Sequence, residues 1–528
     1  MNKFLNGLTS KNTRTENGAL SNSSSGSVIL DYFSNAGAHR NRPESTVAND
    51  MSAIFAENKE LALKTVFYNR LVTRKIKTLG INSPPQRGQG NKDEFIRSLK
   101  WLEANFPDLV YENLYVITQV GCWHDLWYDS PVTKLYHYVN TKYVYPLIAA
   151  AIENNDERPL VAKFLPKIRS ASNVKSDRHK RLNLWAKNLC KYLGWTEKDY
   201  RQFKANPNNS AHDFQRKMCS GKWNALEFNK IPGKALFKLV SREALKKHGL
   251  ENKYLEWLAK QPVAKFTGYP YELLKAARIA TNLVQKNTYN AQFDGLLEQA
   301  KKNLPKELLD SGVWCALDTS GSMSSQVTGE GVTARDVCLG LGIFFSSLIE
   351  GSFKDNVIMF DSTSRILKLS GRLTDKVAQI DRANIAWGST NFQSVIDEIV
   401  RVRRQNPNIP IKDYPKTLLV VSDMQFDCAG TRNQTNYNTA MAKLASVGLP
   451  KMNVIWWDCT GRKKDVPSTI SDEGTTLISG FDGSVLTLLL GQEEKVQIVN
   501  GVEVKVKLNP YEQMLNVLNQ DVLNTLKV

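Results

Sequence analysis

The chain has 528 residues, more than one hydrophobic core usually contains, so the sequence predicts at least two domains. Hydrophobic residues make up 42% and charged residues 23% of the chain, a globular balance that excludes a wholly disordered, collagen-like or disulfide-scaffold protein. No apolar run reaches the length of a membrane span, no signal core follows Met1, and the seven cysteines are scattered without a C-x-x-C pair. We therefore expect a cytoplasmic protein with reduced thiols and no membrane contact.

The positive charge is unevenly distributed along the chain. The whole sequence carries 70 Lys and Arg against 52 Asp and Glu, a net charge of +18. Residues 1–300 hold 45 basic and 27 acidic residues, whereas residues 301–528 hold 25 of each. Residues 158–247 alone hold 22 basic and 6 acidic residues. Such a cluster favours a nucleic-acid partner over the alternative of a solvated basic surface kept for solubility.

The first part of the chain is predicted to be a tail followed by helices. Residues 1–45 are rich in Asn, Ser, Gly and Thr and predict a disordered tail. Between 46 and 305, apolar residues recur at helical spacing, with proline and glycine between the segments. The predicted helices cover residues 51–71, 95–106, 114–127, 135–152, 181–193, 235–248 and 271–284. Successive helix pairs predict a HEAT-like α-helical solenoid or ring, although no clean sequence repeat is visible.

Strands alternate with helices over residues 306–492. The predicted strands cover 313–317, 356–360, 365–369, 417–421 and 452–457, and the predicted helices cover 334–350, 375–381, 392–404 and 436–447. This alternation predicts a doubly wound α/β domain with a parallel sheet. Residues 493–528 follow as a separate end: Asn500-Gly501 between two alternating runs indicates a hairpin, and a helix is expected near 511–526.

Polar side chains follow the predicted strands of this domain at three loops. Asp318, Ser320 and Ser322 come directly after the first strand, Thr390 precedes a helix, and Asp423 follows a buried strand. Ligands of open α/β sheets bind at the carboxyl ends of strands, and oxygen ligands suit Mg²⁺ or Mn²⁺. A turn that only caps a helix would explain Ser320 and Ser322 but not Thr390 and Asp423.

This D-x-S-x-S motif with a distant Thr and a distant Asp resembles the metal-ion-dependent adhesion site of von Willebrand factor A domains. The resemblance implies that Ser320, Ser322 and Thr390 reach the metal by their hydroxyls, directly or through water, and that Asp318 and Asp423 hold coordinated waters. It also implies one position open to an outside carboxylate or phosphate. Two nearby acids, Asp361 and Asp427, are expected to be solvated surface residues.

The sequence does not support catalysis. All six histidines precede residue 300, so no histidine of the predicted α/β domain can act as a base at the metal site. The chain has no G-x-x-x-x-G-K-[ST] motif, which excludes a P-loop ATPase. We therefore expect a protein that is not an enzyme.

A basic helical domain joined to a von Willebrand A domain resembles the Ro ribonucleoprotein (TROVE-module) family. The segments that carry this resemblance are 54–74, Gly121-Cys122-Trp123-His124-Asp125-Leu126, Ala162-Lys163-Phe164-Leu165-Pro166-Lys167 and 214–232. The resemblance implies a ring of antiparallel helical pairs closed by the A domain. It also implies binding of small structured RNA on the outer face and of single-stranded RNA ends in the hole.

The resemblance directs the RNA prediction to the basic stretch of the helical region. The preferred RNA contacts are Lys175, Arg178, His179, Lys180, Arg181, Lys187, Arg216, Lys217 and Lys222. Lys and Arg would neutralise phosphates, and His179 could stack on an unpaired base. We expect a monomer that binds small noncoding or misfolded RNA and contacts a protein partner through the metal. The alternatives are a metal-dependent protein-interaction scaffold and a chelatase-like A-domain subunit working with an ATPase.

Overall fold

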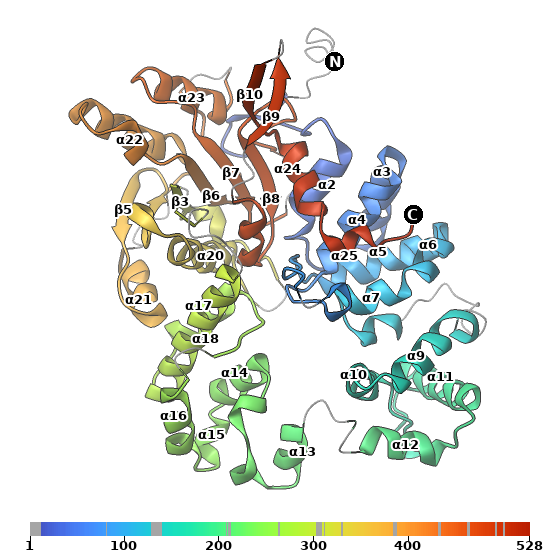
Figure 1. Ribbon diagram of the computed structural model, residues 1–528. Helices are drawn as coiled ribbons and strands as arrows, with labels where there is room; N and C mark the ends of the chain where they lie inside the picture. The colour runs from blue at the N-terminus through green and yellow to red at the C-terminus, as the bar shows by residue number, and fades with distance from the viewer. Residues whose placement is uncertain are drawn as a thin grey trace.

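The computed structural model describes residues 12–528 apart from 81, 128–139, 207–208, 210–212, 262–263, 303–308, 311, 329–330, 384–387, 431–433, 462–464, 491–493 and 500–501. A helical region over residues 28–301 precedes an α/β domain built on a six-stranded sheet (Figure 1). The fold class predicted from the sequence is confirmed at this level. No helix among the described residues is long and apolar enough to cross a lipid bilayer.

The first region begins with a short two-stranded ribbon and continues as helices. The ribbon consists of β1 (Asn12–Arg14) and β2 (Leu20–Asn22). The helices are α2 (Val28–Ala36), α3 (Glu44–Glu57), α4 (Lys59–Arg70), α5 (Lys92–Asn105), α6 (Pro107–Glu112), α7 (Leu114–Val120), α9 (Tyr145–Glu153), α10 (Arg158–Phe164), α11 (Asp177–Leu193), α12 (Glu197–Ala205), α13 (Asp213–Cys219), α14 (Gly233–Ser241), α15 (Ala244–Lys247), α16 (Glu251–Ala259), α17 (Pro270–Arg278) and α18 (Leu283–Lys301).

The α/β domain and the end of the chain follow. The sheet contains β3 (Val313–Asp318), β4 (Asn356–Phe360), β5 (Ser364–Lys368), β6 (Thr417–Ser422), β7 (Asn453–Asp458) and β8 (Thr475–Ser479). Its helices are α20 (Ala334–Leu348), α21 (Leu373–Ala383), α22 (Gln393–Gln405) and α23 (Asn436–Ala445). The hairpin β9 (Glu494–Val499) and β10 (Val502–Lys507) and the helices α24 (Pro510–Leu518) and α25 (Asp521–Asn524) complete the chain. The predicted turn Asn500-Gly501 lies outside the described residues.

The N-terminal segment is folded, so the prediction of a disordered tail over residues 1–45 is wrong for the part that the structure describes. The run Val28-Ile29-Leu30-Asp31-Tyr32-Phe33 starts α2, and its buried side chains pack the helix against β8 and α24. Ser27 caps this helix by accepting a hydrogen bond from the Leu30 amide. The short apolar run was not predicted as a helix because the composition of residues 1–45 as a whole is polar. Residues 1–11 lie outside the described part of the chain.

Capping residues explain where several predicted helices are divided. The predicted helix 51–71 is two helices, α3 and α4, because the Asn58 side chain accepts a hydrogen bond from the Leu61 amide and starts a new helix. The predicted helix 271–284 likewise ends at Arg278, and Asn282 caps the start of α18. The predicted helix 135–152 corresponds to α9, although residues 135–139 lie outside the described residues.

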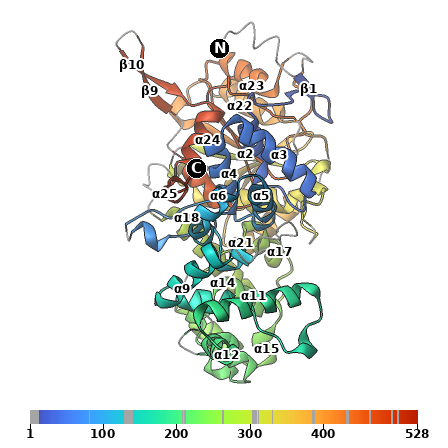
Figure 2. The same cartoon turned by 90° about the vertical axis from the view of Figure 1, so that its right-hand side faces the viewer.

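The helices form an arch that begins and ends on the α/β domain (Figure 1). At its beginning, α2 packs against β8, and α4 contacts the C-terminal helices α24 and α25. The chain then runs through α9 to α12 and α13 to α16, the lowest part of Figure 1, and Figure 2 shows the same helices below the α/β domain. At its end, α17 packs against α20 and α21. Both ends of the arch are therefore fixed by the sheet domain.

The sheet is mostly parallel, in the order β5-β4-β3-β6-β7-β8, with only β5 antiparallel to its neighbour among the described strands. β3 and β6 are buried along their whole length, as expected for central strands covered on both faces, and the edge strand β8 is buried because α2 and α24 pack against it. The predicted strands match β3 to β7 closely, whereas β8 was not predicted. The order of the strands reverses between β3 and β6, and in open α/β sheets ligands bind at the carboxyl ends of the strands at such a point.

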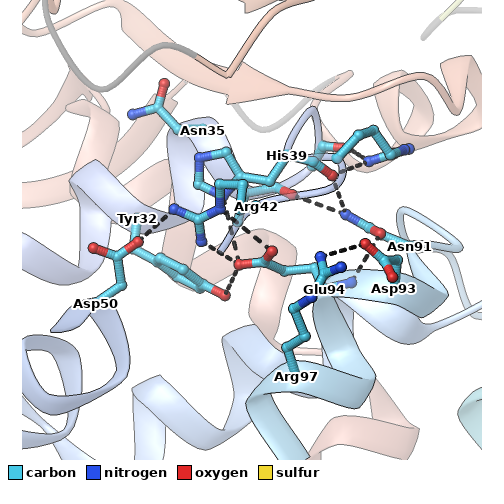
Figure 3. Close-up of polar contacts among 12 residues, drawn as sticks. Tyr32, Asn35, His39, Arg42, Asp50, Asn91, Asp93, Glu94 and Arg97 are labelled. Atoms are coloured by element: carbon cyan, nitrogen blue, oxygen red, sulfur yellow. Dashed lines mark hydrogen bonds and ion pairs between the residues drawn. The ribbon is translucent and has the colours of Figure 1, made fainter. Parts of the chain in front are cut away.

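A buried polar cluster joins the N-terminal segment to α5 (Figure 3). Arg42 forms ion pairs with Glu94 and, at 2.7 Å, with Asp50, while the Tyr32 hydroxyl donates to Glu94 Oε1 at 3.3 Å. Glu94 is almost fully buried. Asn91 Nδ2 donates to the His39 carbonyl at 2.8 Å and so holds the loop after α2. This cluster makes residues 28–57 a part of the folded core.

Candidate functional site

The predicted metal-binding residues lie at the carboxyl edge of the sheet, where the strand order reverses. Asp318 is the last residue of β3, and Asp423 directly follows β6, which pairs with β3 in parallel. Parallel neighbours end at the same edge of a sheet, so the two carboxylates approach each other there. We call Asp318, Ser320, Ser322, Thr390 and Asp423 together the acidic edge.

Short hydrogen bonds orient the Asp318 carboxylate. Its Oδ1 accepts from the Ser320 amide at 2.9 Å, and its Oδ2 accepts from Ser422 Oγ at 2.5 Å. The hydroxyls of Ser320 and Ser322 lie 3.2 Å apart, within hydrogen-bond distance. Asp318 and Ser320 are buried, and Ser322 is half-buried. Asp318 is therefore a buried residue at the end of β3 and not part of an exposed loop.

Backbone hydrogen bonds bring the Thr390 loop to the loop after β3. The Gly321 amide donates to the Gly388 carbonyl at 3.1 Å, which joins the two loops directly. The Thr390 amide donates to Asp427 Oδ1 at 3.1 Å, and Thr390 is buried. Asp423 Oδ1 accepts from the Gln425 amide at 3.2 Å. The structure thus gathers the three predicted loops at one edge of the sheet.

The carboxylates of this edge repel one another. Burial, followed by the charge of Asp423, raises the pKa of Asp318 to about 7. Burial also raises the pKa of Asp458, at the end of β7, to about 6, and Asp423 contributes again. Among the described residues, a hydroxyl and an amide group bond to the Asp318 carboxylate, and no lysine or arginine forms an ion pair with it. The edge therefore has negative charge that a bound cation would neutralise.

The donor set at the edge fits a hard cation only if the hydroxyl groups take part. Among the described residues, no group of three or more His, Cys, Asp and Glu side chains is placed to hold a metal ion. The acidic edge offers two carboxylates and three hydroxyls, all oxygen donors of the kind that Mg²⁺ and Mn²⁺ prefer. Soft-ligand metals such as zinc are disfavoured by the same donor set.

The N-terminal segment contacts the acidic edge at Thr390 and continues along the loop after β6. Asn17 Nδ2 donates to Thr390 Oγ1 at 3.3 Å and to the Gln425 carbonyl at 2.7 Å. Thr15 Oγ1 donates to the Phe426 carbonyl at 2.6 Å, and the Glu16 amide donates to Gln425 Oε1 at 2.8 Å. We call residues 15–18 the strap. A partner that approaches Thr390 has to share this surface with the strap.

Several acidic and polar residues at this edge were not predicted from the sequence. Asp458 ends a buried parallel strand just as Asp318 does, and that position was the available signal. Asp361 is buried, so the expectation of a solvated residue is wrong for it, and Asp427 is half-buried against the Thr390 amide. Nothing in the local sequence marks the strap, because its partners lie about 400 positions away along the chain.

The residues predicted to contact RNA lie on or beside two helices of the arch. Lys175 precedes α11, Arg178, His179, Lys180, Arg181 and Lys187 lie on α11, Arg216 and Lys217 lie on α13, and Lys222 follows α13. Ser176 caps α11 by accepting from the His179 amide at 3.3 Å, which places the basic residues in its first turns. Lys175, Arg178, Lys180 and Arg181 are exposed. Six of the nine residues thus lie on or just before one helix.

Some of these basic residues already have acidic partners. Lys187 pairs with Glu197 at 2.9 Å, Lys217 pairs with Asp213 at 2.8 Å and with Glu227 at 3.0 Å, and Lys180 contacts Asp177 at 3.1 Å. These pairs are exposed and weak, so a phosphate could compete for the lysines. Burial together with the charges of Lys92 and Arg178 lowers the pKa of His124, which places Arg178 near the Gly121–Leu126 segment.

Two comparisons with known proteins bear on this architecture. A family model described as a domain of unknown function, DUF7788, matches residues 314–522. The matched range runs from β3 into α25, so it includes the hairpin that the sequence analysis set apart. An uncharacterized protein of Acanthamoeba polyphaga mimivirus, L728, is 25% identical over 551 residues, covering 97% of this chain and 88% of that protein. The similarity therefore extends over the helical arch as well as the α/β domain.

Proposed function

We propose that the protein binds RNA without catalysis, through the helical arch, and that a Mg²⁺ or Mn²⁺ ion at the acidic edge serves contact with a protein partner. The observation that carries this proposal is the exposed basic start of α11, where Lys175, Arg178, Lys180 and Arg181 follow one another within two turns. The α/β domain and the chain end have no net charge, with 25 basic and 25 acidic residues over 301–528. We therefore expect most of the RNA phosphate contacts on the arch.

The resemblance to the Ro ribonucleoprotein family supports the class of RNA. In that family a helical ring closed by a von Willebrand A domain binds small noncoding RNA and defective RNA ends. An arch whose two ends contact the α/β domain is compatible with such a ring. By the same resemblance, Ser320, Ser322 and Thr390 would hold the metal, and Asp318 and Asp423 would orient its waters. The metal would supply a positive charge for a partner's carboxylate.

Reversing three charges on α11 tests the RNA surface. In the variant Arg178→Glu, Lys180→Glu, Arg181→Glu, we expect RNA affinity at low salt to fall at least tenfold. The slope of log affinity against log salt should flatten by about 2, because each single-strand phosphate contact contributes about 0.7. Electrophoretic shift assays on single-stranded, duplex and hairpin RNA measure both quantities.

The matched control reverses three exposed charges on the α/β domain, in the variant Lys368→Glu, Arg382→Glu, Arg404→Glu. This control changes the net charge by the same amount. It should therefore reproduce only the part of the loss of RNA affinity that comes from net charge and not from contacts on α11. An equal loss of affinity and an equal change of slope in both variants would contradict an RNA surface on α11.

A second prediction tests whether RNA binding belongs to the helical arch and is independent of the metal site in the α/β domain. RNA affinity should stay within about twofold in the variants Asp318→Ala and Asp423→Ala, because phosphate contacts on the arch supply most of the binding free energy. RNA titrations of both variants, and of the wild-type protein with EDTA, measure this. A large loss in the variants that EDTA reproduces would show that the metal itself contacts RNA and that the division of duties is wrong.

One observation favours a second candidate function, a metal-dependent protein-interaction scaffold. The acidic edge already accepts a polypeptide, since the strap places an amide group on Thr390. In that case the arch would be only a platform. Purification after low-salt lysis without nuclease distinguishes the two: co-purified nucleic acid, seen as a raised 260/280 nm absorbance ratio, is expected for the RNA-binding protein and not for the scaffold.

A further inference from the structure

An open cleft of about 670 Å³ lies at the amino-terminal end of the parallel sheet, away from the acidic edge. It is lined by Thr417 and Asn453, which begin β6 and β7, by Ile399 of α22 and Leu444 of α23, and by residues of the β9–β10 hairpin. In Figure 1 this hairpin stands above β7 and β8 at the top of the α/β domain. The volume is in the usual range for small-molecule sites.

Lysines dominate the charge of this cleft. Six of them line it, Lys412, Lys416, Lys451, Lys495, Lys505 and Lys507, against a single acidic residue in the lining, Asp310. Lys495 pairs with Glu512. Lys412, Lys416, Lys451 and Lys505 are exposed and have no ion pair with any residue that the structure describes. The charge balance of residues 301–528 therefore conceals a local excess of positive charge.

The hairpin is fastened to the rest of the rim. Lys507 Nζ donates to the Lys451 carbonyl at 2.8 Å, and Lys505 pairs in register with Val496 across the hairpin. Segments almost 100 residues apart along the chain, near 412 and 507, thus present their ammonium groups to one cleft. Lysine ammonium groups are common phosphate ligands, because each is a compact charge with several donors.

The floor of the cleft is apolar but retains unused polar atoms. Ile399, Leu444, Leu449 and Met452 supply the apolar part. Tyr414 and Asn453 line the cleft, and the Tyr414 hydroxyl and Asn453 Oδ1 are buried atoms that have no hydrogen-bond partner among the described residues. Buried polar atoms without partners are rare and costly, so each is a position where a ligand group could be satisfied.

We propose that this cleft binds a nucleotide, either free or as a unit of an RNA strand, with its phosphates on the lysine rim and its ribose and base over the apolar floor. A nucleotide joins clustered negative charge to a planar ring that has hydrogen-bonding groups, which matches the rim, the floor and the unused atoms of Tyr414 and Asn453. Inorganic anions would use only the rim. An acidic peptide carries its charges on spaced flexible side chains and would leave the floor uncovered.

The test compares the binding of three probes to the whole chain: ADP, inorganic pyrophosphate and a single-stranded oligouridylate of ten nucleotides. Isothermal calorimetry should show saturable binding of ADP or of the oligonucleotide. The variant Lys412→Glu, Lys451→Glu should weaken that binding at least tenfold, whereas the control Lys368→Glu, Arg382→Glu should change it by less than twofold. Tyr414→Phe, which removes only the hydroxyl, should weaken nucleotide binding and leave pyrophosphate unaffected.

The probes also identify the source of the nucleotide. Binding of ADP that is lost in the double variant assigns a free nucleotide, and binding of the oligonucleotide alone, lost in the same variant, assigns a strand. Binding of neither, binding unchanged in the double variant, or pyrophosphate affinity equal to that of ADP would overturn the proposal. The α11 triple variant should retain the cleft's ADP affinity, so failure of RNA binding on the arch and failure of the cleft proposal are distinguishable.

Discussion

Replacing Arg42 by Met should lower the free energy of unfolding by about 3–5 kcal/mol, because the substitution leaves the buried Glu94 carboxylate without its cation. Arg42 forms ion pairs with both Glu94 and Asp50 (Figure 3). Only about a tenth of the Arg42 side chain is exposed. Such a loss is a large fraction of the stability of an ordinary domain. Urea unfolding followed by tryptophan fluorescence measures it.

Arg97→Met is the matched control for this substitution. Arg97 pairs with Asp93 at 2.5 Å in the same region, but Asp93 is about half exposed, so the pair should contribute no more than about 1 kcal/mol. Equal losses in the two variants would show that the buried cluster has no special role.

The same cluster should make the stability of the folded protein depend on pH in the acidic range. Burial acts to raise the pKa of Glu94, but the neighbouring His39 and Arg42 outweigh it and lower the pKa to about 2. A carboxyl with a lowered folded pKa stabilises the protein above its unfolded pKa, so this contribution is lost as pH falls from about 4.5 towards 2. The stability of Arg42→Met should fall less steeply over that interval.

The second large effect is expected at the acidic edge. Asp318→Asn should abolish the rise in melting temperature that Mg²⁺ or Mn²⁺ is expected to produce in the wild-type protein, because a bound ion stabilises the folded state and the substitution removes a charge from its site. Asparagine keeps oxygen and nitrogen atoms where Ser320 and Ser422 now bond, so the fold should persist. Melting curves with each ion and with EDTA measure this.

Asp482→Asn is the control, since Asp482 is a half-buried aspartate outside the acidic edge, and its carboxylate accepts from Thr73 Oγ1 at 3.0 Å. Its stabilisation by metal should equal that of the wild-type protein. If Asp318→Asn retained the full response to metal while calorimetry gave the wild-type affinity, the acidic edge would not be the metal site.

The local pattern of apolar and β-branched residues was sufficient to predict much of the α/β domain. Buried parallel strands are short runs of apolar and β-branched residues, so β4 was predicted with its bounds and β3 to within one residue. The positions of Asp318 and Asp423 at strand ends followed from the same pattern. β8 was missed, although Gly474 and Gly480 enclose its Thr-Thr-Leu-Ile-Ser sequence.

Features that depend on distant pairing could not be predicted. The strap is polar, and its hydrogen bonds go to backbone and side-chain atoms about 400 positions away. The lysine cleft is assembled from several segments between 412 and 507 within a stretch of balanced charge. Neither spacing nor local composition records which segments the fold brings together. The basic start of α11, by contrast, is contiguous and was visible at once.

The strap has a consequence for how the chain folds during its synthesis. Thr15 leaves the ribosome early, but the Phe426 carbonyl that it contacts is 411 residues further along the chain. At about 5–20 residues per second, the N-terminal segment waits roughly 20–80 s for its partner. The strap therefore cannot dock until β6 and the loop that follows it have been made, and α2 has to wait longer, for β8 and α24. A nascent chain stopped before β6 should leave residues 12–22 open to protease, and the completed chain should protect them.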